Sequence, residues 1–142
     1  MKQKVMRAWV RALRSRKYKQ GKYALRSTTR AGNMGSEFCC LGVLCDLYAQ
    51  EHPDDAQWVV NGSRMSCSFS PRAGEIQNNV PHALVMEWAG LKTENGEFRA
   101  PSTAWDDFGF RGSCAQELTS VNDNGATFRQ IATFIEKHWR RL

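Results

Sequence analysis

The amino-acid sequence predicts an α+β fold: a single small domain with a central buried helix, flanking N-terminal and C-terminal helices, and a small antiparallel sheet. Three observations support this prediction. The longest apolar run is SEFCCLGVLCDLY at residues 36–48. Helical apolar periodicity marks residues 2–16 and the C-terminal segment, and short alternating segments with turn signals lie between them. A chain of 142 residues with 42% apolar content is sufficient for one ordinary core, so we expect one domain over residues 1–142.

Residues 2–16 have the periodicity of an amphipathic helix, whose apolar face consists of Val5, Met6, Trp9, Val10 and Leu13. This helix belongs to a basic N-terminal element, residues 1–30, which contains eleven Lys or Arg and no Asp or Glu. The other 112 residues contain nine basic and fourteen acidic ones. Such asymmetry predicts an anionic partner, namely nucleic acid, a nucleotide or an acidic protein surface. A solvated helix face is the alternative interpretation.

The apolar run predicts the core helix, residues 36–48, with Ser36 as its N-cap and Glu37 at the positive end of its dipole. Because apolar side chains cover nearly its whole circumference, this helix is expected to be buried. Gly42 inside it predicts a close backbone contact. A buried strand is the alternative, since the same residue types also suit a strand.

Short strands are predicted on both sides of the core helix. One is expected at residues 23–27, after a basic loop. Residues 58–60 and 64–69 are expected to pair as a hairpin, because Asn61–Gly62 between them is a strong turn signal. Two further short strands are predicted at residues 98–102 and 107–110.

Three more helices are predicted in the second half of the chain. The first has Asn79 as a possible cap and Gly90 just past its end, with Leu84, Val85 and Trp88 facing inward. The second is a short helix at residues 115–121 that ends in an Asn-Asp-Asn-Gly turn. In the last helix, Thr127 and Gln130 form a capping box, and the apolar face consists of Phe128, Ile131, Ala132, Phe134, Ile135 and Trp139.

The cysteines, the absence of known cofactor motifs and the short apolar stretches argue against several classes of protein. The cysteine count is odd and Cys39 and Cys40 are adjacent, so reduced and mostly buried thiols are expected instead of a disulfide framework. The cysteine spacing does not suit zinc, and there is no phosphate loop or dinucleotide fingerprint, so we expect no metal and no cofactor. No apolar stretch is long enough to span a bilayer, and Arg7 and Arg11 interrupt the only candidate signal segment. We therefore expect a cytoplasmic protein without a membrane partner.

The densest group of candidate anion-binding residues lies between Arg11 and Arg26, where six Lys or Arg fall within sixteen residues, namely Arg11, Arg14, Lys17, Lys19, Lys22 and Arg26. Arginine forks grip phosphates, aromatic faces stack on bases, and the Gln20–Gly21 turn lets backbone N–H groups approach a ligand. We therefore predict a small anionic, nucleotide-like ligand or an acidic protein partner. The predicted ligand-binding residues are Arg14, Lys17, Tyr18, Lys19, Gln20, Lys22 and Arg26.

Two other functions are compatible with the residues. A cysteine-dependent hydrolase would use Cys39 or Cys40 in the first turn of the core helix, where the dipole lowers a thiol pKa, with His82 as base. The plainer interpretation is that these cysteines are small buried hydrophobes. Non-specific nucleic-acid binding would use the same basic element, although no sequence-reading DNA motif is present. Asp106–Asp107 and the Asn122–Asp123 turn suit either ribose hydroxyls or helix capping, and capping is favoured.

Five sequence blocks carry a resemblance to a known family. They are ALRS at 12–15, YKQGKYALR at 18–26, FCCLGVLCDL at 38–47, VPHALVMEWAGL at 80–91 and VNDNGATFRQIATFIE at 121–136. As a set, they resemble a family of small proteins that is widespread in phages, prophages and bacterial genomes. The resemblance implies a phage setting, and therefore a role in host takeover or in counteracting host defence. We accordingly predict a phage-type, non-enzymatic binding protein of the host cytoplasm, with a homo-oligomer as a compatible assembly.

Overall fold

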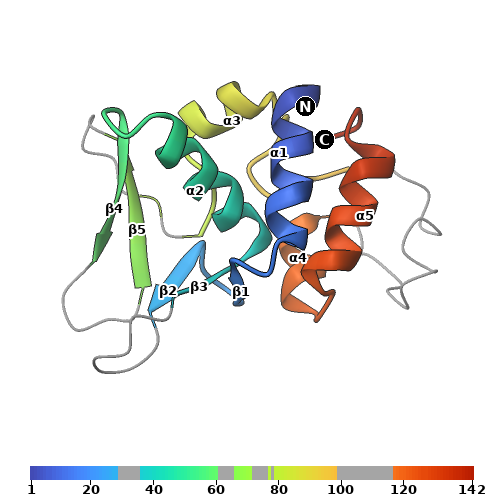
Figure 1. Ribbon diagram of the computed structural model, residues 1–142, viewed down its shortest axis with the longest axis horizontal. Coiled ribbons are helices and arrows are strands. Elements are labelled where there is room, and N and C mark those ends of the chain that lie inside the picture. Colours follow the sequence, from blue (N-terminus) through green and yellow to red (C-terminus); the bar gives the residue numbers. More distant parts are fainter. Residues whose placement is uncertain (29–35, 61–65, 72–76, 78, 99–116) are drawn as a thin grey trace.

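The computed structural model describes residues 1–28, 36–60, 66–71, 77, 79–98 and 117–142. Over these residues the helices are α1 (Gln3–Arg14), α2 (Cys40–Glu51), α3 (Ala83–Ala89), α4 (Leu118–Asp123) and α5 (Phe128–His138). The strands are β1 (Lys19–Gln20), β2 (Arg26–Thr28), β3 (Ser36–Phe38), β4 (Ala56–Val60) and β5 (Ser66–Pro71). The helices and the small sheet occupy separate parts of the molecule, so the predicted α+β class is confirmed (Figure 1).

The central helix of the fold is α2. It lies between the sheet and α1, and α1 contacts both α2 and α5 (Figure 1). The predicted apolar face of α1 is buried, and the indole Nε1 of the fully buried Trp9 donates a hydrogen bond to the carbonyl of Cys40 at 2.9 Å. On α5, Ile131, Phe134 and Ile135 are equally buried. Each such side chain contributes about 1.5–3 kcal/mol through its burial. Of the two terminal helices, α1 thus packs on the core helix as predicted, whereas α5 packs mainly on α1.

The strands form one sheet in the order β1-β3-β2-β5-β4. Three of the strand pairs are antiparallel, while β1 runs parallel to β3. Strands β4 and β5 pair with Trp58 opposite Phe69, which confirms the predicted hairpin strands. The predicted Asn61–Gly62 turn lies outside the described residues, as do the strands predicted at 98–102 and 107–110 apart from Phe98.

The start of the core helix, predicted over residues 36–48, was wrong. Residues Ser36–Phe38 are β3, and α2 begins at Cys40. The N-cap is Cys39, whose Sγ accepts a hydrogen bond from the backbone N–H of Gly42 at 3.3 Å. The apolar run divides here because β3 pairs with β1 on one side and with β2 on the other, so neighbouring strands satisfy its backbone groups. The strand interpretation therefore holds for the first three residues, and the helix interpretation for the residues from Cys40 onward.

Gly42 makes the close backbone contact that its position in the helix predicted. A Cβ atom built at Gly42 would lie 1.6 Å from the carbonyl oxygen of Leu25, just before β2. The backbone N–H of Cys39 donates a hydrogen bond to the same carbonyl at 3.2 Å. The first turn of α2 therefore lies directly against the backbone that leads into the sheet.

The end of α3 confirms the prediction for Gly90, and its beginning corrects the prediction for Asn79. Gly90 has a left-handed φ of 64°, and the N–H of Leu91 closes the last turn, as in a Schellman motif. The N-cap, however, is His82, whose Nδ1 accepts a hydrogen bond from the backbone N–H of Leu84 at 3.2 Å. The ring of His82 therefore takes the place in the cap that an asparagine side chain was expected to take.

Two further predictions have mixed outcomes. Leu84 is 38% exposed instead of facing inward, because α3 turns Val85 and Ala89 to the core. The short helix predicted at residues 115–121 is α4, which extends to Asp123. The capping box that opens α5 is present as predicted.

Candidate functional site

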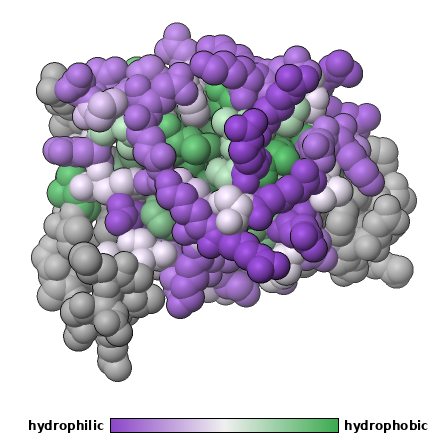
Figure 2. All heavy atoms as spheres, viewed as in Figure 1, coloured by the Kyte–Doolittle hydropathy of each residue, from purple (hydrophilic) through white to green (hydrophobic). Residues whose placement is uncertain are grey.

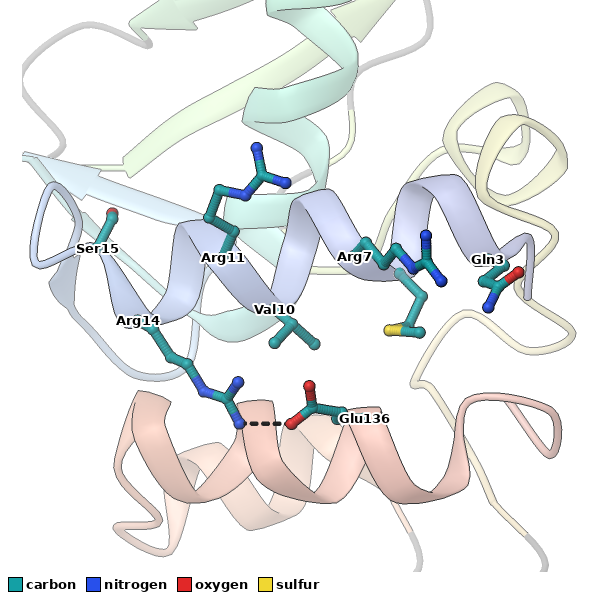
Figure 3. Close-up of a pocket in the computed structure, with 8 residues that line it drawn as sticks. Gln3, Arg7, Val10, Arg11, Arg14, Ser15 and Glu136 are labelled. Atoms are coloured by element: carbon teal, nitrogen blue, oxygen red, sulfur yellow. Dashed lines mark hydrogen bonds and ion pairs between the residues drawn. The ribbon is translucent and has the colours of Figure 1, made fainter.

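A groove with a volume of about 690 Å³ runs along α1 where this helix faces α5 (Figure 3). Arg7, Arg11 and Arg14 are four and three positions apart, so they follow one another along one side of the helix. Met6 and Val10 are buried and form the apolar floor between the two helices. The remaining described lining residues are Gln3, Ser15 and, from α5, Glu136.

The charges in this groove are unbalanced. The Nη2 atom of Arg14 reaches across to Glu136 Oε2 at 2.8 Å, and also donates a hydrogen bond to Thr133 Oγ1 at 3.3 Å (Figure 3). The hydrogen bond and the positive charge of Arg14 hold the pKa of Glu136 below its usual range. Arg7 and Arg11 are exposed, and neither forms an ion pair with any of the described residues. Three arginines and a single carboxylate therefore line the groove, and only Arg14 points at that carboxylate, while Arg11 points away from it (Figure 3).

The lining of the groove, as far as the structure describes it, contains no aromatic side chain. Trp9 belongs to the same helix but is fully buried on the side of α2. Over the face that α1 and α5 present, Figure 2 shows mostly hydrophilic side chains with hydrophobic atoms visible between them. The groove thus combines cationic edges with an apolar floor, and its described lining offers no face for stacking.

Of the predicted ligand-binding residues, Tyr18 and Gln20 have structural partners. The hydroxyl of Tyr18 donates to Asp46 Oδ2 at 2.7 Å, and burial, followed by this hydrogen bond, raises the pKa of Tyr18 to about 12. The Gln20 Nε2 atom donates to Asn122 Oδ1 at 3.0 Å and to the carbonyl of Ala126 at 2.7 Å. The Gln20 contacts hold β1 against α4 and the segment before α5, and the Tyr18 contact joins the residue before β1 to α2. Both side chains therefore serve the fold.

Two of the predicted cations are held on the sheet. Lys19 Nζ lies 2.6 Å from Glu37 Oε1 on the adjacent strand. The guanidinium of Arg26 donates two hydrogen bonds to Ser36 Oγ, at 2.9 and 3.0 Å. It also lies over the rings of Phe38 and Trp58, at 5.2 and 5.3 Å from their centroids. Arg26 therefore joins β2, β3 and β4 at the aromatic face of the sheet.

The remaining predicted residues divide between the groove and the surface. Lys17 lies over the ring of Tyr18 at 5.5 Å, and Lys22 is exposed. Only Arg14 of the seven lines the groove. Sequence reasoning counted Arg11 in the basic cluster but selected neither Arg11 nor Arg7 as ligand-binding, although their helical spacing with Arg14 is the signal that would have found them.

The residues of the hydrolase alternative lie in apolar surroundings. Burial raises the pKa of the Cys39 thiol to about 11, which outweighs the backbone hydrogen bonds that favour the thiolate. Cys40 is fully buried, with its pKa well above the ordinary value and its Sγ 3.5 Å from the carbonyl of Leu118. The Nδ1 atom of His82 accepts the cap hydrogen bond of α3. These environments favour neutral thiols and do not favour an activated nucleophile.

A search for metal sites and membrane spans gives two negative results over the described ranges. No three His, Cys, Asp or Glu side chains there are grouped as metal ligands would be. None of the described helices is long and apolar enough to cross a bilayer.

Comparison with known proteins assigns the chain to a family. No curated protein and no solved structure matches it. Residues 1–139 match the model of a domain of unknown function, DUF8296, which thereby covers all the elements from α1 to α5. This protein therefore belongs to the DUF8296 family.

Proposed function

We propose that this protein is a non-enzymatic binding protein that holds an acidic segment of a partner protein in the groove between α1 and α5. The observation that carries this proposal is the pair Arg7 and Arg11, exposed beside an apolar floor and without an acidic partner among the described residues. A segment that carries both carboxylates and apolar side chains would complement these two features at once.

The groove favours a protein segment over a nucleotide or a nucleic acid. Arginine forks bind phosphates as well as carboxylates, but nucleotide and single-strand sites usually add an aromatic face for the base. The described lining has no such face. The apolar floor of Met6 and Val10 suits the apolar side chains of a peptide.

The biological setting of this proposal comes from the sequence resemblance. In a phage setting, the acidic partner would be a host protein, and covering its acidic surface would counteract host defence. The resemblance supports this part of the proposal, and the groove supports the choice of an acidic partner.

A peptide-binding measurement tests the groove directly. The probe is a fluorescent helical peptide that carries glutamate on one face and leucine on the other, and its binding is followed by anisotropy at several salt concentrations. The double variant Arg7→Ala/Arg11→Ala should weaken binding about tenfold or more, because the two unpaired charges are lost. Raising the salt should weaken binding to the unchanged protein, since exposed charges are screened within about 10 Å at 0.1 M salt.

The matched control is Lys17→Ala/Lys22→Ala, which removes the same charge outside the groove. It should leave the affinity for the peptide nearly unchanged. Equal weakening by the two double variants would show that net charge alone attracts the peptide, and the groove proposal would be wrong. Tighter binding of ADP-ribose or of an oligothymidine than of the acidic peptide would favour the nucleotide or nucleic-acid alternative instead.

A further inference from the structure

A second, smaller cavity lies at the N-terminal end of α2, and none of its described lining residues belongs to the groove. Its volume is about 220 Å³. Its described lining comes from the turn between β1 and β2, the segment before α3, the segment after α3, α4 and the N-cap of α2. The residues are Tyr23, Ala24, Cys39, Asn79, Val80, Asn95, Thr119 and Asp123.

Three polar side chains that line this cavity, Asp123, Asn95 and the exposed Asn79, have unused hydrogen-bonding capacity. Asp123 Oδ1 accepts hydrogen bonds from the backbone N–H of Tyr23 at 3.1 Å and from Asn122 Nδ2 at 3.0 Å. Both hydrogen bonds that the described residues donate to this carboxylate go to Oδ1, which leaves Oδ2 for a ligand. The side-chain amides of Asn79 and Asn95 form no hydrogen bond with the described part of the chain. Each amide can therefore donate to a ligand and accept from it.

Tyr23 combines an exposed aromatic ring with a left-handed backbone, which among the described non-glycine residues it shares with Arg16. Its side chain is 76% exposed, and its φ of 64° lies in the left-handed region that favours glycine. A ring that is mostly in water gains little from packing, so packing does not explain a tyrosine in a strained conformation. Strain that folding does not explain is common at ligand sites. The hydrogen bond to Asp123 fixes this backbone beside the cavity, where the ring can cover a bound molecule.

We propose that this cavity binds a neutral, hydroxyl-bearing ring of pentose or hexose size, either a free sugar or the ribose of a nucleoside. Asp123 would accept hydrogen bonds from two neighbouring hydroxyls, Asn79 and Asn95 would bond to the other oxygens, and the ring of Tyr23 would cover the apolar face of the sugar. An acidic side chain that receives ribose hydroxyls is a recurring arrangement in proteins.

The size and charge of the cavity limit the ligand. Its volume lies below the ~300–1,000 Å³ of typical sites for drug-sized molecules, so it suits a single ring. Asp123 is the only charged side chain among the described lining residues. A phosphate or carboxylate inside the cavity would therefore meet a like charge without a compensating cation. The side chains of Ala24, Val80 and Cys39 supply the small apolar surface that the carbon atoms of a sugar need.

Ligand-observed NMR with four probes tests the proposal. The probes are methyl β-D-ribofuranoside, methyl α-D-glucopyranoside, adenosine and 2′-deoxyadenosine. At least one probe with neighbouring hydroxyls should bind, and 2′-deoxyadenosine should bind about tenfold more weakly than adenosine, because it lacks one of the two hydroxyls. Equal binding of the riboside and adenosine would identify the sugar alone as the ligand, and tighter binding of adenosine would identify a nucleoside.

The variant Tyr23→Gly separates binding from stability. It relieves the left-handed strain, so its melting temperature should rise, while its affinity for the best probe should fall about tenfold. Asn95→Ala should lower the affinity similarly with little change in melting temperature. The matched control is Asn124→Ala, an exposed neighbour outside the cavity, which should bind as the unchanged protein does.

Three results would overturn the proposal. The first is that no probe binds at millimolar concentration. The second is that both Tyr23→Gly and Asn95→Ala bind the best probe as well as the unchanged protein does. The third is that ribose 5-phosphate, added as a fifth probe, binds more tightly than the riboside. The proposal requires the opposite order, because the charge of Asp123 disfavours an anion. None of these results depends on the α1 groove, so the two proposals can fail separately.

Discussion

At the scale of single residues, Gly42 is the most constrained position. Replacing it with alanine would improve helix propensity by about 1 kcal/mol, but the added carbon would lie 1.6 Å from the carbonyl oxygen of Leu25. The clash forces α2 away from the sheet, so we expect Gly42→Ala to lower the free energy of unfolding by about 1–3 kcal/mol or more. Urea denaturation measures the change.

Gly125→Ala is the matched control for this substitution. Gly125 has a φ of 99°, and a Cβ atom there would meet nothing within 4 Å. Its replacement should therefore cost only the backbone strain, about 1–2 kcal/mol. If Gly42→Ala proved no more destabilising than Gly125→Ala, the tight contact with Leu25 would be absent in solution.

The thiol of Cys39 tests the hydrolase alternative. Its pKa of about 11 keeps it neutral near pH 7, and alkylation requires the thiolate. We expect iodoacetamide to modify Cys39 slowly in the folded protein, faster as the pH rises toward 11, and much faster in urea. Peptide mass spectrometry can follow this residue separately. Rapid modification of the folded protein at neutral pH would instead support an activated nucleophile.

Ionisation of the Tyr18 hydroxyl should lower the stability of the folded protein at alkaline pH. Its pKa is about 12 in the folded protein, against 10.0 for the ordinary group. Because the pKa is higher in the folded state, the neutral hydroxyl of Tyr18 stabilises the fold. This stabilisation is complete below pH 10 and is lost as the pH rises through 12. Tyr18→Phe should lower the free energy of unfolding by about 1.5–3 kcal/mol at neutral pH, since a hydrogen bond to Asp46 is lost.

In Tyr18→Phe, the loss of stability at alkaline pH should also be smaller. Tyrosinate absorbance and urea denaturation, followed together from pH 9 upward, would show one fewer high-pH tyrosine in Tyr18→Phe. Tyr23→Phe is the control, because its ring is mostly exposed and should change neither the stability at neutral pH nor the alkaline loss. An unchanged alkaline loss of stability in Tyr18→Phe would assign that loss to another group.

At the scale of elements, the fully buried Asn122 connects α4 to two other parts of the fold. Its Nδ2 donates to the carbonyl of Gly21 at 2.9 Å, and its Oδ1 accepts from the backbone N–H of Cys40 at 3.2 Å. Asn122→Ala would leave these backbone groups buried without a partner. Because each unsatisfied group costs about 1–3 kcal/mol, we expect thermal or urea unfolding to show a loss of roughly 3 kcal/mol.

Asn124→Ala provides the comparison for this prediction. Asn124 is exposed, and its Nδ2 donates to the carbonyl of Ser120 at 2.8 Å within the same helix. Its loss should cost below about 1 kcal/mol. Similar costs for the two variants would mean that Asn122 does not join α4 to α2.

Elements whose signals are local could be predicted from the sequence. The face of α1 follows from apolar periodicity, the start of α5 from Thr127 and Gln130, and the end of α3 from Gly90. Strand β3 could not be distinguished from a helix start, because Ser36 and Glu37 also suit an N-cap and a first turn, and its strand state depends on pairing with β1 and β2. Strand β1, which runs parallel to β3, could not be predicted either, because two residues carry no periodicity of their own.

The candidate sites could be predicted only in part, for a related reason. Charge density correctly indicates that cations gather near the N-terminus, and Arg14 does line the groove. Composition cannot show that Tyr18 and Gln20 are already bonded to Asp46 and Asn122, far along the chain. The smaller cavity was not predicted either, because its lining comes from separate segments that only the fold brings together. The Asn122–Asp123 turn was noted for ribose, although capping was preferred.

At the scale of the whole molecule, the two ends of the chain meet. The amino group of Met1 lies 3.4 Å from the carbonyl of Leu142, and Leu142 is fully buried. Joining these ends with a few glycine and serine residues should therefore cause little strain. Because a closed chain has less entropy when unfolded, we expect cyclisation to raise the free energy of unfolding by about 2–4 kcal/mol.

Denaturation of the cyclic and linear proteins under the same conditions checks this expectation. The linear protein with the same linker attached to Leu142 but left open is the control, because it separates closure from the effect of added residues. A cyclic protein less stable than this control would contradict the adjacency of the termini.

The pairing of α1 with α5 also determines the order in which the newly made chain can fold. Almost the whole length of the sequence separates Arg14 from Phe128. A ribosome adds about 5–20 residues per second, so α5 is made on the order of ten seconds after α1. During that interval the apolar stripe of α1 has no α5 to cover it. We therefore expect the apolar residues of α1 that pack on α5 to stay accessible to a chaperone until the last helix emerges.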